Sequence, residues 1–394
     1  MPLANGRPFL AIPGPSVMPE AVLREMSRPM ANIYDGPLVE MTAGLYPDLK
    51  RVARTDGRVM IYICNGHGSW EASIVNTLDP GDKILVLDTG RFAIGWGEMA
   101  AAHGCEVEYQ AAPARRGVDP QMVEDRLRAD TAGEIKAVLT TQIDTATGVW
   151  NDVAAIRKAI DAAGHPALYM ADCMASLGCT PYEMDEWGVD VTLAGSQKGL
   201  MTPPGIAFSW VSDKAWEATK RLTRGRAHWA WEDRAEPEFY YQRFHGTAPV
   251  QHLYALRVAL DMIFAEGLET VWARHASLAA GVRAAVRKWS EGGPLELNVT
   301  DPDACAASVT TILTGEVDAA ALRAFAEANL GVTLGIGLGM EESAGFRIGH
   351  MGHVNAPMVL GALGATELAL AHIGAPHATG GVEAAIAAMK AGAA

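Results

Sequence analysis

Short apolar runs alternate with longer segments of helical periodicity between residues 60 and 208, and this alternation constrains the fold more than any other feature. The predicted strands cover residues 59–64, 83–87, 106–109, 137–141, 167–171, 189–194 and 206–210. Predicted helices between them include 69–77, 96–103, 120–128 and 153–163. Because alternating strands and helices favour parallel strand pairing, we expect an α/β fold: a mostly parallel, doubly wound sheet flanked by helices.

The pattern changes after about residue 252. Two long helices rich in Ala and Leu are predicted over 252–266 and 268–291, followed by strands near 307–314 and 345–348 and a last helix over 381–394. We interpret this part as a smaller α+β domain. The predicted organisation is an N-terminal segment (1–20) that packs on the small domain, a large domain (21–260) and the small C-terminal domain (261–394).

Composition disfavours several classes of function. The 394 residues are 49% hydrophobic and 20% charged, as in an ordinary globular protein, and the formal charge of −14 argues against nucleic acid as a partner. Five cysteines without a CxxC pair indicate reduced thiols. The N-terminus has no secretory signal and no apolar run reaches membrane-spanning length, so we expect a cytoplasmic protein without a membrane partner.

One acidic and one basic residue stand at the ends of two predicted strands. Asp172 closes the run 167–171, and Lys198 follows 26 residues later, in a turn of small and polar residues after the run 189–194. An enzyme that uses pyridoxal phosphate (PLP) requires such a pair: the lysine forms a Schiff base with the aldehyde, and the carboxylate keeps the pyridine nitrogen protonated. Strand-end aspartates and loop lysines are also common as caps and surface charges, so this pair alone is weak evidence.

Two further polar loops follow predicted strands. The segment 65–71, Asn-Gly-His-Gly-Ser-Trp-Glu, has the glycines and the helix start that favour phosphate binding, but it matches no nucleotide-binding fingerprint. Taken alone, it is better interpreted as a tight turn with a capping serine. The hydroxyl-rich loop 141–148 is either a cofactor contact or a simple turn.

Arg347 lies in the predicted strand 345–348, flanked by apolar residues and glycines. Arginine suits two-pronged binding of a carboxylate, and the alternative is a buried arginine paired with an acidic residue of its own fold. His350 and His353 have the spacing of metal ligands on a helix, but a strand precedes them and no third ligand is near, so we expect no metal site. The glycine-rich stretch 334–339 is interpreted as a flexible turn.

Several motifs occur together in one order along the chain. They are Pro13-Gly14-Pro15-Ser16, Gly66-His67-Gly68-Ser69-Trp70-Glu71-Ala72, Asp172 with Ala175-Ser176-Leu177-Gly178, Ser196-Gln197-Lys198, Thr247-Ala248-Pro249 and Phe346-Arg347-Ile348-Gly349. This series resembles the class V PLP-dependent aminotransferases, in the branch of the alanine–, serine– and aspartate–glyoxylate aminotransferases. The resemblance implies a PLP-dependent transferase of fold type I and an obligate homodimer whose active sites lie at the subunit interface.

The resemblance also implies a role for each site residue. Lys198 binds the cofactor and moves the proton, and Asp172 pairs with the pyridine nitrogen. The remaining cofactor contacts are Gly66, His67 and Gln197 at the phosphate, Thr145 beside them, Phe92 stacked on the ring and Thr247 reaching the phosphate from the neighbouring subunit. Arg347 binds the α-carboxylate of the substrate.

One departure from the family bears on the amino donor. Where the family often has Tyr-His-His-Thr, residues 244–247 read Phe-His-Gly-Thr, which removes a hydroxyl and opens space. Tyr240 or Tyr241 would have to replace that hydroxyl. The space beside Arg243, with Arg91 as a second candidate cation, favours an acidic donor. We expect L-aspartate, which gives oxaloacetate while glyoxylate becomes glycine.

Other functions stay open at this point. Serine and alanine are the alternative donors. A class V PLP lyase such as a cysteine desulfurase is a second possibility, although Cys305 lies beside a predicted strand rather than in a mobile loop, and Phe92 stands where such an enzyme has a histidine. A third is a ligand-binding protein without catalysis, which would not need both Lys198 and Asp172.

Overall fold

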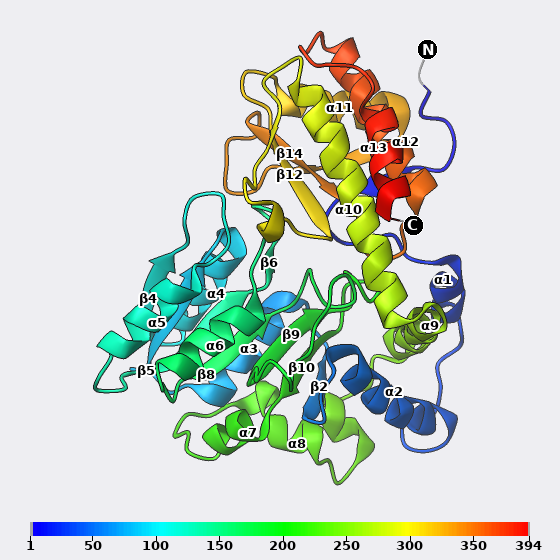
Figure 1. Ribbon diagram of the computed structural model, residues 1–394. Helices are drawn as coiled ribbons and strands as arrows, with labels where there is room; N and C mark the ends of the chain where they lie inside the picture. The colour runs from blue at the N-terminus through cyan, green and yellow to red at the C-terminus, as the bar shows by residue number, and fades with distance from the viewer. Residues whose placement is uncertain (1–2, 393–394) are drawn as a thin grey trace.

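The computed structural model describes residues 3–392, which form a larger and a smaller region, each built around a sheet (Figure 1). The larger sheet has the order β2 (Arg58–Tyr62), β10 (Ala207–Val211), β9 (Val191–Gly195), β8 (Leu168–Asp172), β5 (Ile135–Thr141), β3 (Lys83–Asp88) and β4 (Glu106–Ala111). The smaller has the order β1 (Phe9–Ala11), β13 (Val332–Ile336), β14 (Gly345–Gly349), β12 (Val309–Leu313) and β11 (Glu296–Leu297). A short ribbon pairs β6 (Ile143–Asp144) with β7 (Val149–Trp150).

The larger sheet is mostly parallel, which confirms the predicted α/β class. Its strands pair in parallel from β4 through β3, β5 and β8 to β9, whereas β10 runs antiparallel to both of its neighbours, β9 and β2. Because β2 and β9 are both antiparallel to β10, they point in the same direction. The carboxyl ends of β2, β3, β5, β8 and β9 therefore meet at one edge of the sheet.

Helices cover both faces of this sheet because its strands alternate buried side chains between two cores. Val59 and Ile61 of β2 pack in one core, and Met60 and Tyr62 pack in the other. The first core is closed by α2 (Pro37–Ala53), α5 (Pro120–Ala129), α6 (Val153–Ala162) and α9 (Val250–Glu266). The second is closed by α3 (Gly66–Thr77), α4 (Arg91–Ala102), α7 (Asp213–Thr219) and α8 (Trp231–Ala235).

The smaller region has its own core, formed by the second sheet and the C-terminal helices. These helices are α10 (Leu268–Ser290), α11 (Ala319–Leu330), α12 (Ala356–His372) and α13 (Gly381–Gly392). The N-terminal strand β1 joins this sheet, in parallel with β13, and α1 (Glu20–Met26) packs on α9 through Val22. The long α10 runs from the larger region into the smaller one (Figure 1). The domain boundaries at residues 20 and 260 stay a prediction.

Three local expectations need correction. Helices α3 and α4 begin at Gly66 and Arg91, earlier than predicted, because Asn65 caps the first and the distant Asp144 accepts hydrogen bonds from the first amides of the second. The stretch 334–339 is not only a flexible turn, because β13 extends to Ile336 and pairs with β14. The last helix is described to Gly392, and the predicted residues 393–394 lie outside the described range.

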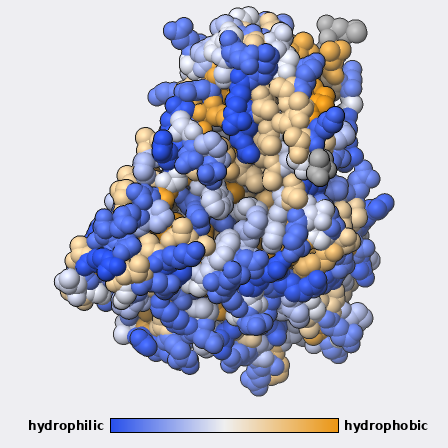
Figure 2. Space-filling view, viewed as in Figure 1, coloured by the Kyte–Doolittle hydropathy of each residue, from blue (hydrophilic) through white to orange (hydrophobic). Residues whose placement is uncertain are grey.

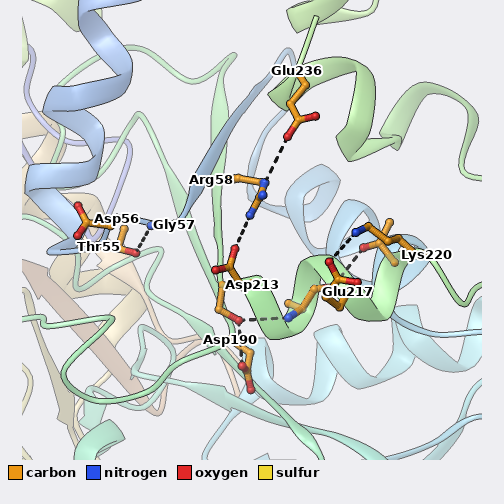
Figure 3. A network of polar contacts seen from close by, with 12 residues as sticks. Thr55, Asp56, Gly57, Arg58, Asp190, Asp213, Glu217, Lys220 and Glu236 are labelled. Atoms are coloured by element: carbon orange, nitrogen blue, oxygen red, sulfur yellow. Dashed lines mark hydrogen bonds and ion pairs between the residues drawn. The ribbon is translucent and has the colours of Figure 1, made fainter.

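Ion pairs lie at the opposite end of strand β2, away from the carboxyl ends of the parallel strands (Figure 3). Arg58, the first residue of β2, lies 2.6 Å from Asp213 of α7 and 3.8 Å from Glu236, which follows α8. The Asp213 side chain is 91% exposed, so this pair contributes little to stability. The contact lies away from the carboxyl edge and bears on the fold alone.

The surface is hydrophilic over most of the larger region, and hydrophobic residues are more frequent in the upper part of the same view, where α10 and α13 lie (Figure 2). Ile386 of α13 is an exposed large hydrophobic residue. Within residues 3–392, no helix is both long and apolar enough to cross a membrane.

Candidate active site

A cavity of about 210 Å³ lies at the carboxyl edge of the larger sheet. Its walls come from the segments that follow β2, β3, β5, β8 and β9. The lining residues are Asn65, Gly66, His67, Trp70, Phe92, Ile143, Thr145, Asp172, Met174, Ala175, Gln197 and Lys198. In open α/β sheets this edge is where ligands bind.

Asp172 is the last residue of β8, and its carboxylate is held by two hydrogen bonds. Nε1 of Trp70 donates to Oδ2 over 2.9 Å, and the N–H of Met174 donates to Oδ1 over 2.7 Å. Burial raises the pKa of Asp172 to about 6, while these two bonds favour the charged form. A carboxylate that is buried and still ionised near neutral pH is suited to hold a protonated ring nitrogen.

Lys198 lines the same cavity in the turn that follows β9. Its ammonium donates a hydrogen bond to the carbonyl of Pro13. The N-terminal segment also holds this turn, since Ser16 donates from its N–H to the Gln197 carbonyl (2.8 Å) and from Oγ to the Lys198 carbonyl (2.7 Å). Burial lowers the pKa of Lys198 to about 8, and the charge of Arg347 acts in the same direction. The amine is therefore neutral more often near physiological pH than a surface lysine.

The start of α3 forms the wall beside Gln197. Asn65 caps this helix by accepting a hydrogen bond from the N–H of His67 over 3.1 Å. A Cβ atom at Gly66 would lie 2.7 Å from Cε of Met174, so a larger residue there would displace the end of that flexible side chain. Oε1 of Gln197 is buried without a hydrogen-bond partner. The N-terminus of a helix offers N–H donors and positive potential to an anion.

Phe92 and Thr145 complete the wall from the segments after β3 and β5. The Phe92 ring meets the Trp70 ring edge-on, with centroids 6.4 Å apart. Thr145 is buried, and its carbonyl accepts a hydrogen bond from Nη1 of Arg347 over 2.8 Å. Both residues line the cavity, and the cofactor contact predicted for each stays a prediction.

Arg347 reaches this wall from β14 of the smaller sheet. Its side chain is buried, and Nε donates to the carbonyl of Ile336 over 2.6 Å. Burial lowers the pKa of Arg347 to about 10, a shift that Asp144 opposes. Two backbone carbonyls thus orient the guanidinium, and no carboxylate of the described residues forms an ion pair with it. The alternative of an arginine paired within its own fold is not what the structure has.

The sequence from β2 to β14 matches the family model of the class V aminotransferases over residues 60–347. The chain belongs to this family. It is a PLP-dependent aminotransferase with the fold type I architecture of these enzymes.

Individual relatives match over almost the whole chain. A serine–glyoxylate aminotransferase of Methylorubrum extorquens is 39% identical over 374 residues, covering 93% of this chain and 91% of the relative. An L-aspartate–glyoxylate aminotransferase of Paracoccus denitrificans is 38% identical over 367 residues, covering 93% and 91%. The solved structure of pyridoxamine–pyruvate aminotransferase from Mesorhizobium loti superimposes with a TM-score of 0.90 at 28% identity, and 98% of each chain is covered.

The residues of the cavity fit PLP. The buried carboxylate of Asp172 suits the protonated ring nitrogen, and Lys198 supplies a primary amine with a lowered pKa. The start of α3, which lines the cavity beside Gln197, offers N–H donors and positive potential to a phosphate. These are the groups that a phosphorylated pyridine aldehyde needs.

One predicted cofactor contact of this aminotransferase lies elsewhere. Thr247 is exposed and does not line the cavity of its own chain. It follows the short helix η2 (Tyr240–Phe244). The sequence predicted that Thr247 acts in the neighbouring subunit, and this stays a prediction.

Tyr240 does not supply this cavity with the hydroxyl that Phe244 lacks. Phe244 is fully buried and packs against Tyr240, with ring centroids 5.5 Å apart. The hydroxyl of Tyr240 lies 2.9 Å from Oγ1 of Thr42, so it points into its own chain rather than into the cavity. Tyr241 is 45% exposed and stacks on Phe239, with ring centroids 5.9 Å apart, and it stays the candidate to supply the missing hydroxyl.

The two candidate cations for a second carboxylate differ in their surroundings. Arg91 pairs with Glu98 over 2.8 Å, and both side chains are about half exposed at 51% and 57%. Its charge lowers the pKa of His67, after the larger effect of burial; Arg91 does not line the cavity itself but directly precedes the lining residue Phe92. Arg243 instead lies over the ring of Tyr46, 4.6 Å from its centroid, and does not line the cavity.

The two histidines after β14 differ: His353 is exposed, whereas His350 has a structural role. His350 is fully buried between Oγ1 of Thr310 and the carbonyl of Ala307, each 2.9 Å away. Burial lowers its pKa to about 3. Among residues 3–392, no group of three or more His, Cys, Asp or Glu side chains is placed to hold a metal ion.

Sequence reasoning gave no role to three residues of the site: Trp70, Asp144 and Pro13. Trp70 donates to Asp172, Asp144 accepts from the start of α4, and Pro13 accepts from Lys198. Trp70 offered a signal, because a position one helical turn after Gly66 faces the same side of α3. The contacts of Asp144 and Pro13 join distant segments, so no local sequence pattern predicts them.

Proposed function

We propose that this aminotransferase transfers the amino group of L-aspartate to glyoxylate, giving oxaloacetate and glycine. The main support for transfer to an α-keto acid is that Lys198 and Asp172 line one cavity. Arg347 is hydrogen-bonded to the carbonyl of Thr145 in the wall of the same cavity. The names of the relatives from Methylorubrum and Paracoccus support glyoxylate as the acceptor.

Bound PLP supplies an aldehyde that takes up the amino group and a protonated ring that accepts electrons when the α-proton leaves. We assign to Asp172 the task of holding the proton on the ring nitrogen, because it is the buried carboxylate of the cavity. Nζ of Lys198, once neutral, accepts the α-proton of the donor. In the second half of the reaction the same atom delivers a proton to the α-carbon of glycine.

The remaining lining residues are assigned to hold the cofactor. Gly66, His67 and Gln197 bind the phosphate at the start of α3, with Thr145 beside them, and Phe92 stacks on the ring. Arg347 binds the α-carboxylate that every substrate carries, through the guanidinium hydrogens that Ile336 and Thr145 leave free.

We further propose a cytoplasmic homodimer with shared active sites, in which Thr247 completes the phosphate contacts of the neighbouring subunit. The exposure of Thr247 in its own chain supports this assignment. All five cysteines are free thiols, which fits a reducing compartment.

The acidic donor rests on Arg91. Its partner Glu98 is exposed, and exposed ion pairs are worth little, so a substrate carboxylate can replace Glu98 at small cost. L-serine is the second candidate donor, because relatives at 39% and 40% identity carry the name serine–glyoxylate aminotransferase. Alanine is third.

A lyase of the cysteine desulfurase type has less support. Cys305 is half-buried, burial raises the pKa of its thiol, and it does not line the cavity. A nucleophilic cysteine would need a lowered pKa and access to the substrate.

The test is a donor panel with glyoxylate as acceptor. The purified holoenzyme is given aspartate, serine or alanine, and both glycine and the matching keto acid are measured. Oxaloacetate formed from aspartate at the highest kcat/KM supports the proposal. Hydroxypyruvate from serine without oxaloacetate from aspartate selects the second candidate, and no glycine from any donor rejects glyoxylate as the acceptor.

A further inference from the structure

Asp144 is a buried carboxylate that the proposed chemistry does not use. It ends β6, just before the cavity residue Thr145, and its side chain is 0% exposed. A buried carboxylate costs free energy unless its environment compensates the charge.

Backbone amides from two segments supply that compensation. Oδ2 accepts hydrogen bonds from the N–H of Phe92 (2.9 Å) and of Ala93 (3.2 Å), and Oδ1 accepts one from the N–H of Ala146 (2.9 Å). Phe92 and Ala93 belong to the first turn of α4, where the unpaired amides and the helix dipole favour a negative charge. One side chain therefore caps a helix from 52 positions away.

The chain makes room for this contact. Gly90, the residue before α4, faces Asp144 so closely that a Cβ atom would lie 2.7 Å from Cγ of the carboxylate. Any other residue at position 90 would push α4 and Asp144 apart. The start of α4 and the loop after β5 are thus locked together as one unit.

The locked unit bears both the ring-stacking candidate and the phosphate-side candidate. Phe92 lines the cavity from α4, and Thr145 lines it from the loop. The Thr145 carbonyl also accepts the hydrogen bond from Nη1 of Arg347 (2.8 Å) that orients the guanidinium. Asp144 directly precedes Thr145, and its charge raises the pKa of Arg347, against the larger effect of burial.

We propose that Asp144 is a positioning residue that fixes Phe92 against the cofactor and, through Thr145, fixes the orientation of Arg347 toward the substrate carboxylate. Asp144 touches neither cofactor nor substrate. This inference rests on the proposed roles of Phe92, Thr145 and Arg347.

The test compares Asp144→Asn with Asp144→Ser. Asparagine keeps the size of the side chain but turns an N–H₂ group toward one set of amides, so one set loses its acceptor. Serine keeps one acceptor oxygen and removes the charge. Asp152→Asn is the matched control, because Asp152 caps α6 by accepting from the N–H of Ala155 over 2.9 Å and does not line the cavity.

Two readouts separate positioning from general stability. The first is the dissociation constant of PLP from the apoenzyme, followed by tryptophan fluorescence well below the melting temperature. We expect an increase of about tenfold for both Asp144 variants, the effect of losing charge-assisted hydrogen bonds, and no change for Asp152→Asn. The second is the circular dichroism of the bound cofactor, which reports its orientation and should change in the Asp144 variants alone.

The outcomes decide between the alternatives. Folded variants with unchanged PLP affinity and unchanged cofactor dichroism overturn the proposal, and so does failure of both variants to fold, since Asp144 would then serve overall stability. If only one variant folds, that variant decides. Phe92→Leu is measured in parallel: if it leaves PLP affinity unchanged, the assignment of Phe92 fails, whereas an effect of Phe92→Leu without one of Asp144 overturns the positioning role only.

Discussion

The indole N–H of Trp70 lies 2.9 Å from Oδ2 of Asp172, although 102 positions separate the two residues in the chain. This bond joins the first turns of α3 to the end of β8 inside a buried site. It favours the ionised form of Asp172, against burial, which raises the pKa to about 6. The tryptophan thus supports the charge that the cofactor ring requires.

Trp70→Phe removes the donor and keeps most of the ring. The pKa of Asp172 should rise further above about 6, since a bond that lowers it is lost. Asp172 is ionised only above its pKa, so the acidic limb of the pH profile of kcat/KM should move to higher pH. We expect a loss of about tenfold on the acidic side, the effect of one hydrogen bond to a charged group.

Trp96→Phe is the control for this prediction. Trp96 is fully buried and stacks with Trp70 at a centroid distance of 6.4 Å, but its Nε1 has no hydrogen-bond partner. It should lower stability without moving the pH profile. An acidic limb that stays in place in Trp70→Phe would show that the indole does not act on Asp172.

Lys198 should give the apoenzyme a pH-dependent rate of PLP capture. Only the neutral amine attacks an aldehyde, and burial lowers the pKa of Lys198 to about 8. The capture rate should therefore rise with pH up to about 8 and level off above it, as measured by the visible absorbance of the bound cofactor in stopped flow. Lys198→Ala should lose both turnover and the borohydride-reducible link to the protein. Reduction that places the cofactor on another lysine would contradict the assignment.

The placement of the site at one sheet edge could be predicted from the sequence, because strand–helix alternation sets the direction of successive strands. Asp172 at the end of β8 and Lys198 after β9 meet there for that reason. Gly66, His67, Phe92, Thr145 and Gln197 line the same cavity, and Arg347 reaches its wall. The roles of these residues are what the experiments have to establish.

Other parts of the site could not be predicted, because they depend on how distant segments pack. Asp144 caps α4 across 52 positions, and Pro13 accepts from Lys198 across 185. The antiparallel direction of β10 could not be predicted either, since its apolar run resembles those of the parallel strands. Burial of Phe244 and the turning of Tyr240 to Thr42 depend on side-chain packing, which no local pattern specifies.

Arg347→Lys should weaken binding of every substrate. Lysine keeps the charge but loses the hydrogen bonds to Ile336 and Thr145 that orient the group, as well as the two-pronged geometry. We expect the KM values of donor and glyoxylate to rise about tenfold or more, since charged, bidentate bonds are the strong ones. Steady-state kinetics with both substrates varied is the measurement. Unchanged KM values for both would make Arg347 a residue of the fold alone.

Thr247 provides a test of shared active sites by complementation. Thr247→Ala should weaken PLP binding, and Lys198→Ala should be inactive. When the two variants are mixed and allowed to exchange subunits, one site of each mixed dimer combines an intact Lys198 with an intact Thr247. Activity at limiting PLP should then exceed that of either variant alone. No gain after subunit exchange, or an active monomer in sedimentation, would place Thr247 outside the neighbouring site.

Arg91 is expected to determine the preference for aspartate as the donor. The carboxylate of the aspartate side chain is expected to take the place of Glu98, which pairs over 2.8 Å with Arg91, the residue before the cavity residue Phe92. Arg91→Gln should raise the KM for aspartate by about tenfold or more, the effect of truncating one partner of a charge pair at a binding site. Serine has no side-chain carboxylate, so its KM should stay the same.

Glu98→Gln is the matched control for Arg91→Gln. It removes the competing carboxylate and leaves the cation, so the KM for aspartate should stay equal or fall. Arg243→Gln tests the other candidate, and since Arg243 lies over Tyr46 rather than at the cavity, its effect should not discriminate between donors. If Arg91→Gln changes the KM of aspartate and serine equally, Arg91 does not read the side chain. If Arg243→Gln alone impairs aspartate, the second cation comes from that segment instead.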